Sequence, residues 1–310
     1  MTQISSSKAS AAYVILAFAI VYVVWGSTYF FIRIAVDGFP PMLMGAVRYS
    51  IAGLLLLGWC AVRKQPVWNR RDIVNSGISG LLMLFLANGI VIWVEQVLPS
   101  AMVAIMVSVN PMWFVVLDKA NWKKNLRNVA TLLGLLSGFI GVLMLFGQEL
   151  GQQAAQPKEG YLQGIILLIF APVAWAAGSL WSKGKTSASP VSVNTAWQMI
   201  VAGLAFFLLA ALHDEFNAFN PASVPLRSWL AIAYLIIFGS IAAFSAYVWL
   251  LKVRPATQVS THAYVNPVIA VLLGVFFAGE HVTFWHMTGL AVILLSVLLL
   301  NLDKYVRRHA

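Results

Sequence analysis

Ten long runs of predominantly apolar residues dominate this sequence. The hydrocarbon core of a bilayer is about 30 Å thick, so an α-helix needs roughly 20 apolar residues to cross it. Runs of that length cover residues 13–36, 41–62, 73–94, 100–118, 129–147, 161–182, 190–212, 228–250, 257–278 and 283–302. Several connectors are only a few residues long, which favours a tight bundle. The pattern therefore predicts an all-α integral membrane protein with ten transmembrane helices.

The composition agrees with this class and excludes a soluble protein. Hydrophobic residues make up 61% of the 310 residues and charged residues only 10%, and a soluble domain has too little polar surface to cover so much apolar material. The net charge of +10 comes from short connectors rather than from one face, so no nucleic-acid partner is expected. Cys60 is the single cysteine, which excludes an intramolecular disulfide. No cofactor, metal ligand or catalytic residue is predicted.

The basic residues predict the orientation of the helices. Both tails and alternate connectors hold 16 of the 20 Lys and Arg residues, and the opposite connectors hold two, Lys158 and Arg227. The remaining two, Arg33 and Arg48, lie within apolar runs. Because Lys and Arg accumulate on the cytoplasmic side of membrane proteins, both termini are expected in the cytoplasm.

One segment occurs twice. "VLPSAMVAIMVSVNP" begins at Val97 and "VRPATQVSTHAYVNP" begins at Val253, and the two share six of fifteen residues, including the final Asn-Pro. The copies divide the chain into two five-helix repeats, residues 13–147 and 161–302. Since five is odd, the second repeat is expected to be inverted relative to the first, an arrangement used by secondary transporters.

Several motifs resemble one family. They are "WGSTYFFIRIAV" at 25–36, "PP" at 40–41, "RY" at 48–49 and "AYVNPVIAVLLG" at 263–274 followed by glycines at 279 and 289. Together they resemble EamA-type proteins of the drug/metabolite transporter superfamily. The resemblance implies a ten-helix carrier of the prokaryotic inner membrane, usually an exporter of small metabolites, amino acids or toxic compounds. It also implies that helices one to four and six to nine surround a cavity, with helices five and ten behind them. His262 stands where the family more usually has a small or apolar residue.

The repeated helices carry side chains suited to such a cavity. Residues four apart lie nearly above one another on a helix, which predicts one stripe in the ninth run and a matching one in the fourth. The stripes consist of Gln258, His262 and Asn266, and of Met102, Met106 and Asn110. Polar groups are costly against lipid, so the first stripe is expected to face the interior, either lining the cavity or bonding helices together.

Other interior residues are candidates for the substrate pathway. Trp25 and Trp175 occupy equivalent places in the two repeats and are expected to form aromatic walls. Asn88 and Gln198 lie within the third and seventh runs and either line the pathway or join helices. Arg48 lies about 10 Å deep, at 1.5 Å per residue.

Arg48 has two alternative roles. It either binds a substrate carboxylate or forms an ion pair on the outer side of the membrane with Glu95 or Glu280.

Proline and glycine predict two further features. Pro111 and Pro267 remove a helical hydrogen bond, so each is expected to bend its helix, as a hinge or as a fixed kink. Gly134 and Gly138 begin a small-residue stripe in the fifth run. Such stripes allow close helix contacts, here either with the tenth helix or between protomers.

The leading functional hypothesis is secondary transport that exports amino acids or related small metabolites by uniport or exchange. Efflux of apolar or cationic toxic compounds, with or without proton coupling, is the alternative. His262 is the only deep group expected to titrate near neutrality, and no carboxylate lies in the middle of a run to meet a cation. A membrane enzyme is less favoured. The expected partners are a small-molecule substrate and the lipid bilayer, with the chain as a monomer or homodimer.

Overall fold

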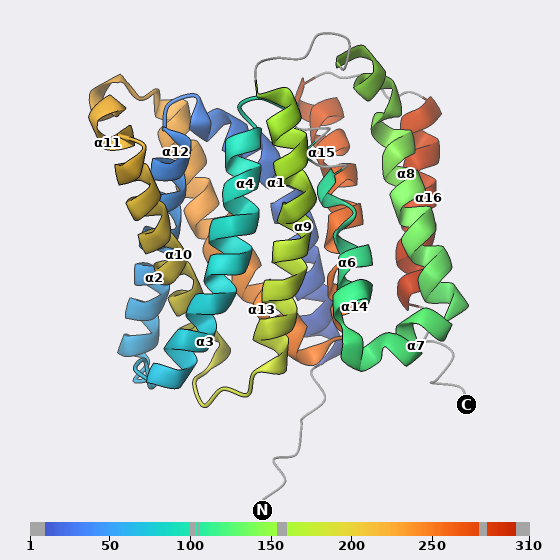
Figure 1. Ribbon diagram of the computed structural model, residues 1–310, viewed down its shortest axis with the longest axis horizontal. Coiled ribbons are helices and arrows are strands. Elements are labelled where there is room, and N and C mark those ends of the chain that lie inside the picture. The colour runs from blue at the N-terminus through green and yellow to red at the C-terminus, as the bar shows by residue number, and fades with distance from the viewer. Residues whose placement is uncertain (1–9, 99–102, 104–105, 154–159, 279–283, 302–310) are drawn as a thin grey trace, which may run out of the picture.

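The computed structural model describes residues 10–98, 103, 106–153, 160–278 and 284–301. These residues form a bundle of helices that run between two ends of the molecule, with α1 starting at the lower end in Figure 1. The principal helices are α1 (Ala11–Val36), α2 (Pro41–Val62), α3 (Arg70–Gly80), α4 (Asn88–Val94), α6 (Asn110–Leu117), α8 (Val129–Gln153), α9 (Tyr161–Gly184), α10 (Val191–Leu212), α12 (Leu226–Tyr234), α13 (Ser245–Val253), α14 (Ala256–Val259), α15 (His262–Ala278) and α16 (Phe284–Asn301). No strand occurs among them.

Six helical segments are long and apolar enough to cross a membrane. They are Ala11–Val36, Pro41–Val62, Arg70–Val94, Tyr161–Gly184, Val191–Leu212 and Leu226–Val253. Shorter apolar helices occur at Val129–Met144 and Met287–Leu300. These findings confirm an all-helical, membrane-type chain over the part that the structure describes.

Two of the six long segments contain a π-helical stretch. In the first, Leu81–Ala87 (η1) joins α3 to α4. In the second, Leu235–Phe244 (η4) joins α12 to α13. A π-helix has an i→i+5 hydrogen-bond pattern, which changes the helical period, and it is rare, with its occurrences frequently at functional sites. Each stretch therefore shifts which side chains face the interior.

The repeated segments are also interrupted. The ninth predicted span breaks after α14, and α15 begins at His262, five residues before Pro267, which lies inside α15. In the fourth span a turn at Ser108 and Val109 precedes α6, and Pro111 occupies the first turn of that helix. A proline there costs nothing, because the first N–H groups of a helix have no intrahelical partner.

Side chains satisfy the carbonyls freed at the break before α15. Thr261 Oγ1 donates to the Gln258 carbonyl at 2.7 Å, and Ser260 Oγ donates to the Thr257 carbonyl at 2.9 Å. His262 Nδ1 bonds the Val259 carbonyl at 2.9 Å. The polar residues of this otherwise apolar segment therefore make an irregular backbone tolerable inside the bundle.

An acidic side chain caps the start of a helix at each end of the bundle. The carboxylate of Glu215 accepts from the N–H groups of Met42 and Leu43, at 3.3 and 2.7 Å, at the start of α2. Asp72 accepts from both the N–H and the hydroxyl of Ser189, at 2.9 and 2.7 Å, just before α10. A carboxylate at a helix N-terminus complements the helix dipole.

The glycine stripe of α8 packs within the molecule. A Cβ on Gly138 would lie 2.5 Å from Ser296 Oγ, and one on Gly134 would lie 2.8 Å from Leu300 Cγ. Ser296 Oγ also donates to the Gly134 carbonyl at 2.6 Å. Of the two uses that the sequence allowed for this stripe, the structure shows contact with α16, which lies beside α8 in Figure 1.

Gly80 lies at a close contact between α3 and α10. A Cβ added at this position would lie 2.2 Å from the Gln198 carbonyl oxygen, a backbone atom that cannot rotate away. The two helix backbones would have to separate.

We expect Gly80→Ala to destabilise the protein by about 1–3 kcal/mol, the usual cost of overpacking. Thermal unfolding in detergent measures the effect, with Gly58→Ala as the matched control, since a Cβ there meets nothing within 4 Å. Equal melting temperatures of the two variants would contradict this account of the α3–α10 contact.

Candidate functional site

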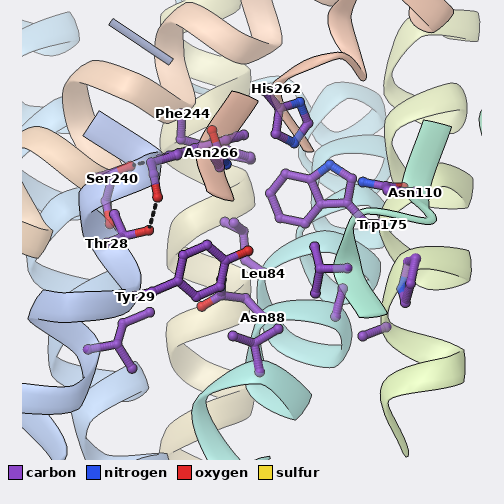
Figure 2. Close-up of a pocket in the computed structure, with 18 of the residues that line it drawn as sticks. Thr28, Tyr29, Leu84, Asn88, Asn110, Trp175, Ser240, Phe244, His262 and Asn266 are labelled. Atoms are coloured by element: carbon purple, nitrogen blue, oxygen red, sulfur yellow. Dashed lines mark hydrogen bonds between the residues drawn. The ribbon is translucent and has the colours of Figure 1, made fainter. Parts of the chain in front are cut away.

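A cavity lies in the interior of the bundle. The space between its walls is about 720 Å³, a figure that includes space open to solvent. Its walls come from α1, α2, η1, α4, α6, α9, η4 and α15, and Figure 2 shows Thr28, Asn88, Trp175 and Ser240 converging on it. The described lining residues are Trp25, Thr28, Tyr29, Ile32, Arg48, Tyr49, Leu84, Ala87, Asn88, Val91, Val107, Asn110, Ala171, Pro172, Trp175, Gly239, Ser240, Phe244, His262 and Asn266.

Aromatic rings form one side of this cavity. The Trp25 ring meets that of Trp175 edge to face at 5.3 Å between centroids, and it lies 5.0 Å from the His262 ring. The Phe244 ring stacks on the Trp25 ring at 6.5 Å between centroids, and the Tyr247 ring lies 4.9 Å from the Trp25 ring. Edge-to-face and offset contacts of this kind stabilise aromatic clusters beyond their buried area. The cluster offers a rigid apolar surface to a ligand.

Hydrogen bonds fix the orientation of both tryptophans. Trp25 Nε1 donates to the Gly239 carbonyl at 3.1 Å, and Trp175 Nε1 donates to Tyr247 Oη at 2.8 Å. Tyr247 Oη lies 2.7 Å from Ser179 Oγ, and Ser179 Oγ donates to the Trp175 carbonyl at 2.7 Å. The single hydroxyl proton of Ser179 is used in its bond to the Trp175 carbonyl, so the Tyr247 hydroxyl donates to Ser179 Oγ. These bonds close a hydrogen-bonded ring of Trp175, Tyr247 and Ser179 in which every donor is satisfied.

A polar wall contains the one fixed charge among the described lining residues, Arg48. Its Nε donates to Ser240 Oγ at 2.9 Å, and its Cζ lies 4.9 Å from the centre of the Tyr49 ring. Tyr49 in turn donates to Asn88 Oδ1 at 2.8 Å. These contacts connect α2, α4 and η4 across the bundle.

The two asparagines of the repeated segment both reach the cavity. Asn110 is 1% exposed and Asn266 is 5% exposed. The Oδ1 atom of each is buried and has no hydrogen-bond partner among the described residues. Buried acceptors without partners are rare in proteins, so each amide is available to a ligand or to water.

His262 adds a further acceptor. Its Nδ1 forms a hydrogen bond with the carbonyl oxygen of Val259. A carbonyl oxygen can only accept, so Nδ1 is the donor. In the neutral ring the Nδ1 atom therefore carries the proton, and Nε2 holds a lone pair.

Seven of the predicted pathway residues line the cavity: Trp25, Arg48, Asn88, Asn110, Trp175, His262 and Asn266. Three others do not. Met106 packs in a cluster beside the cavity, Gln258 is buried on α14, and Gln198 lines a smaller pocket further down α10. Met102 lies outside the described residues.

The contacts described for Arg48 do not include Glu95. Glu95 is fully buried, and its backbone carbonyl accepts from Arg33 Nη1 at 2.6 Å. Glu280 lies outside the described residues, so an ion pair with Arg48 stays a prediction there.

Several lining residues were missed by the sequence analysis. Thr28, Tyr29 and Ile32 follow Trp25 at +3, +4 and +7 on the same helix face, a signal that was present. Ser240 and Phe244 lie in η4, where the surrounding sequence is uniformly apolar and the helical period itself changes. No sequence signal marked them.

A second, smaller pocket lies toward the lower end of the bundle. Its lining includes Asp72, Gln198 and Lys252. Beside it, Lys183 of α9 donates to the carbonyls of Leu251 and Arg254 at the end of α13. Lys252 of α13 donates to the carbonyls of Ser182 and Lys185 at the end of α9. Each helix thus supplies a cation to the unsatisfied C-terminal carbonyls of the other.

The hydrogen-bonded ring around Tyr247 leads to a prediction. Tyr247→Phe leaves the Trp175 N–H without its acceptor, which is expected to cost roughly 1–2 kcal/mol. Thermal unfolding in detergent tests it, and Tyr13→Phe is the control because Tyr13 is 68% exposed. An unchanged melting temperature for Tyr247→Phe would show that the hydrogen bonds of the Tyr247 hydroxyl contribute no stability.

Comparisons with known proteins identify the family. The EamA-like transporter family matches residues 12–147 and 162–302. The uncharacterized inner membrane transporter YedA of Escherichia coli K12 is 34% identical over 288 residues, covering 92% of this chain and 89% of that protein. The uncharacterized transporter YoaV of Bacillus subtilis strain 168 is 21% identical over 301 residues, covering 95% and 98%.

The fold also has a solved counterpart. A protein of known crystal structure has a TM-score of 0.75 and 20% identity, and the match covers 94% of this chain and 98% of that chain. The predicted family is confirmed: the chain belongs to the EamA-like transporter family and is a membrane transporter.

Proposed function

We propose that the protein is a secondary transporter that exports amino acids or related small metabolites by alternating access, as a uniporter or exchanger. The observation that carries the proposal is the interior cavity, which combines an aromatic surface with Arg48, Asn110 and Asn266. Such a combination suits a small molecule with an apolar body and polar groups. Related proteins are inner-membrane transporters and this chain has several membrane-spanning helices, so it is a multi-pass protein of the prokaryotic inner membrane.

Alternating access by this chain rests on ten transmembrane helices in two inverted repeats, residues 13–147 and 161–302, with both termini in the cytoplasm. Three pairs of features support the repeats: the two family matches, the two π-helical stretches, and the caps at α2 and α10. Each cap comes from the opposite half of the chain, and the two lie at opposite ends of the bundle, as an inverted repeat requires. Pro111 and Pro267 are the proposed hinges. Inverted repeats allow one half to open while the other closes.

Efflux of apolar or cationic compounds is the second candidate. The aromatic cluster favours it, but no carboxylate occurs among the described lining residues, and a cation would meet the like charge of Arg48. A membrane enzyme is less favoured, because the related proteins are transporters. The proposed partners are the small-molecule substrate and the bilayer, with the chain as a monomer or homodimer.

Counterflow in proteoliposomes tests the proposal. Vesicles loaded with threonine, phenylalanine or cysteine are expected to take up the same labelled compound with saturable kinetics, with or without a pH gradient. Recovery of the unchanged compound would exclude an enzyme. A pH-gradient dependence that His262→Gln abolishes would instead establish proton coupling through His262, and exchange of toxic cations alone would establish the second candidate.

Filling the cavity should stop transport. Ala87 is 3% exposed and lines the cavity, so Ala87→Phe places a ring in the space that a ligand needs. We expect the initial rate of counterflow to fall roughly tenfold or more, because the added ring takes space between the cavity walls that the substrate would fill. The matched control is Ala233→Phe, at an exposed position of α12. Equal rates in the two variants would place the transport pathway elsewhere.

A further inference from the structure

Arg48 is in an unusual position for a charged residue. It lies within the membrane-spanning helix α2, is 4% exposed, and lines the central cavity. A charged side chain inside a membrane protein is costly unless it is paired, and it commonly marks the pathway of a substrate or ion. Its surroundings therefore indicate what the cavity binds.

Two contacts hold the guanidinium, and a glycine leaves room for it. Nε donates to Ser240 Oγ at 2.9 Å, and the Tyr49 ring lies under Cζ. Nη2 lies 3.1 Å from where a Cβ of Gly239 would be, so the absence of a side chain at Gly239 leaves room for it. None of these neighbours carries a full negative charge.

One nitrogen of the guanidinium, Nη1, is buried and has no hydrogen-bond partner among the described residues. A buried unsatisfied donor costs about 1–3 kcal/mol, and more when it is charged. A planar guanidinium with a free N–H matches a carboxylate better than any other common anion of metabolism except phosphate.

Acceptors line the same cavity. Asn110 Oδ1 and Asn266 Oδ1 have no partner among the described residues, and His262 Nε2 holds a lone pair in the tautomer that its bond to Val259 selects. Carbonyl and imidazole acceptors suit an ammonium group, while the tryptophan rings suit an apolar side chain.

We propose that Arg48 binds the carboxylate of the transported molecule, while Asn110, Asn266 and His262 accept hydrogen bonds from its ammonium group. The cavity then selects small zwitterions and rejects molecules that lack the carboxylate. This proposal rests on the proposed transport function and names the group that recognises its substrate. Arg48 is thereby a specificity-determining residue and not merely a helix contact.

The test compares ligands that differ only in charge. Counterflow in proteoliposomes uses phenylalanine, threonine and their carboxamides, which keep the amine and side chain but lose the carboxylate. The variants are Arg48→Gln, Arg48→Lys and the control Arg33→Gln, since Arg33 is exposed and does not line the cavity.

The wild-type protein is expected to exchange the amino acids roughly tenfold to a hundredfold better than the carboxamides, the range for hydrogen bonds to charged groups. Arg48→Gln should lose this preference, because its exchange of the amino acids falls toward that of the carboxamides. Arg48→Lys should keep part of the preference, because it retains the charge but not the planar fork. Arg33→Gln should behave like the wild-type protein.

A purely structural Arg48 gives a different result, in which Arg48→Gln lowers exchange of amino acids and carboxamides alike. That result, or equal exchange of both by the wild-type protein, would overturn the proposal and leave transport intact. No exchange of any of the four compounds by the wild-type protein would overturn the proposed amino-acid transport itself.

A second variant keeps the proposal testable if Arg48→Gln does not fold. Ser240→Ala keeps the guanidinium but removes its Nε acceptor, so it is expected to weaken stabilisation by phenylalanine, measured as the shift in melting temperature, and not that by phenylalaninamide. An equal loss for both ligands, or no loss for either, would contradict the proposal.

Discussion

A membrane interior offers no water to backbone N–H and C=O groups, and the rest of this structure follows from that constraint. Regular helices satisfy these groups within themselves, which is why the described chain is helical throughout its apolar segments. Four departures from regular α-helix lie beside the interior cavity: η1, η4, the break before α15 and the turn before α6. Irregular backbone is tolerable at the break before α15 because polar side chains supply the missing partners.

The same constraint explains why the cavity is divided between aromatic and polar walls. Trp25 and Trp175 are large apolar groups whose single N–H must be paired, and each finds an acceptor from η4 or α13. Arg48, Asn110 and Asn266 keep polar atoms that have no partner in the part of the chain that the structure describes. On the aromatic side the polar atoms of the tryptophans are hydrogen-bonded within the protein. On the other side several polar atoms are left for a ligand to bind.

Much of this arrangement could be predicted from the sequence. The apolar runs predicted the helices, and the repeated Asn-Pro segment predicted two of the cavity's asparagines. The pairing of Trp25 with Trp175 followed from their equivalent places in the two halves, and the structure brings their rings into contact. The deep Arg48 was recognisable because a buried charge in a membrane helix is costly.

The predictions about which side chains line the cavity differ from the structure for one physical reason. Gln258 and Met106 were expected to continue the stripes of His262 and Asn110 because each lies four residues earlier. A break or turn in the backbone separates each from its neighbour, so the helical period does not carry across. Ser240 and Phe244 were missed for the related reason that a π-helical stretch changes the period within a uniformly apolar sequence.

The crossed lysines at the lower end of the bundle limit how that end can come apart. Lys183 and Lys252 each belong to one helix and bond the last carbonyls of the other, so separating α9 from α13 breaks both sets of bonds at once. A partly separated pair would leave the two ammonium groups and several C-terminal carbonyls without each other as partners. The two sets of bonds at this end are therefore expected to form and break together. Peptide carbonyls do not titrate, so acid alone has no group among these acceptors on which to act.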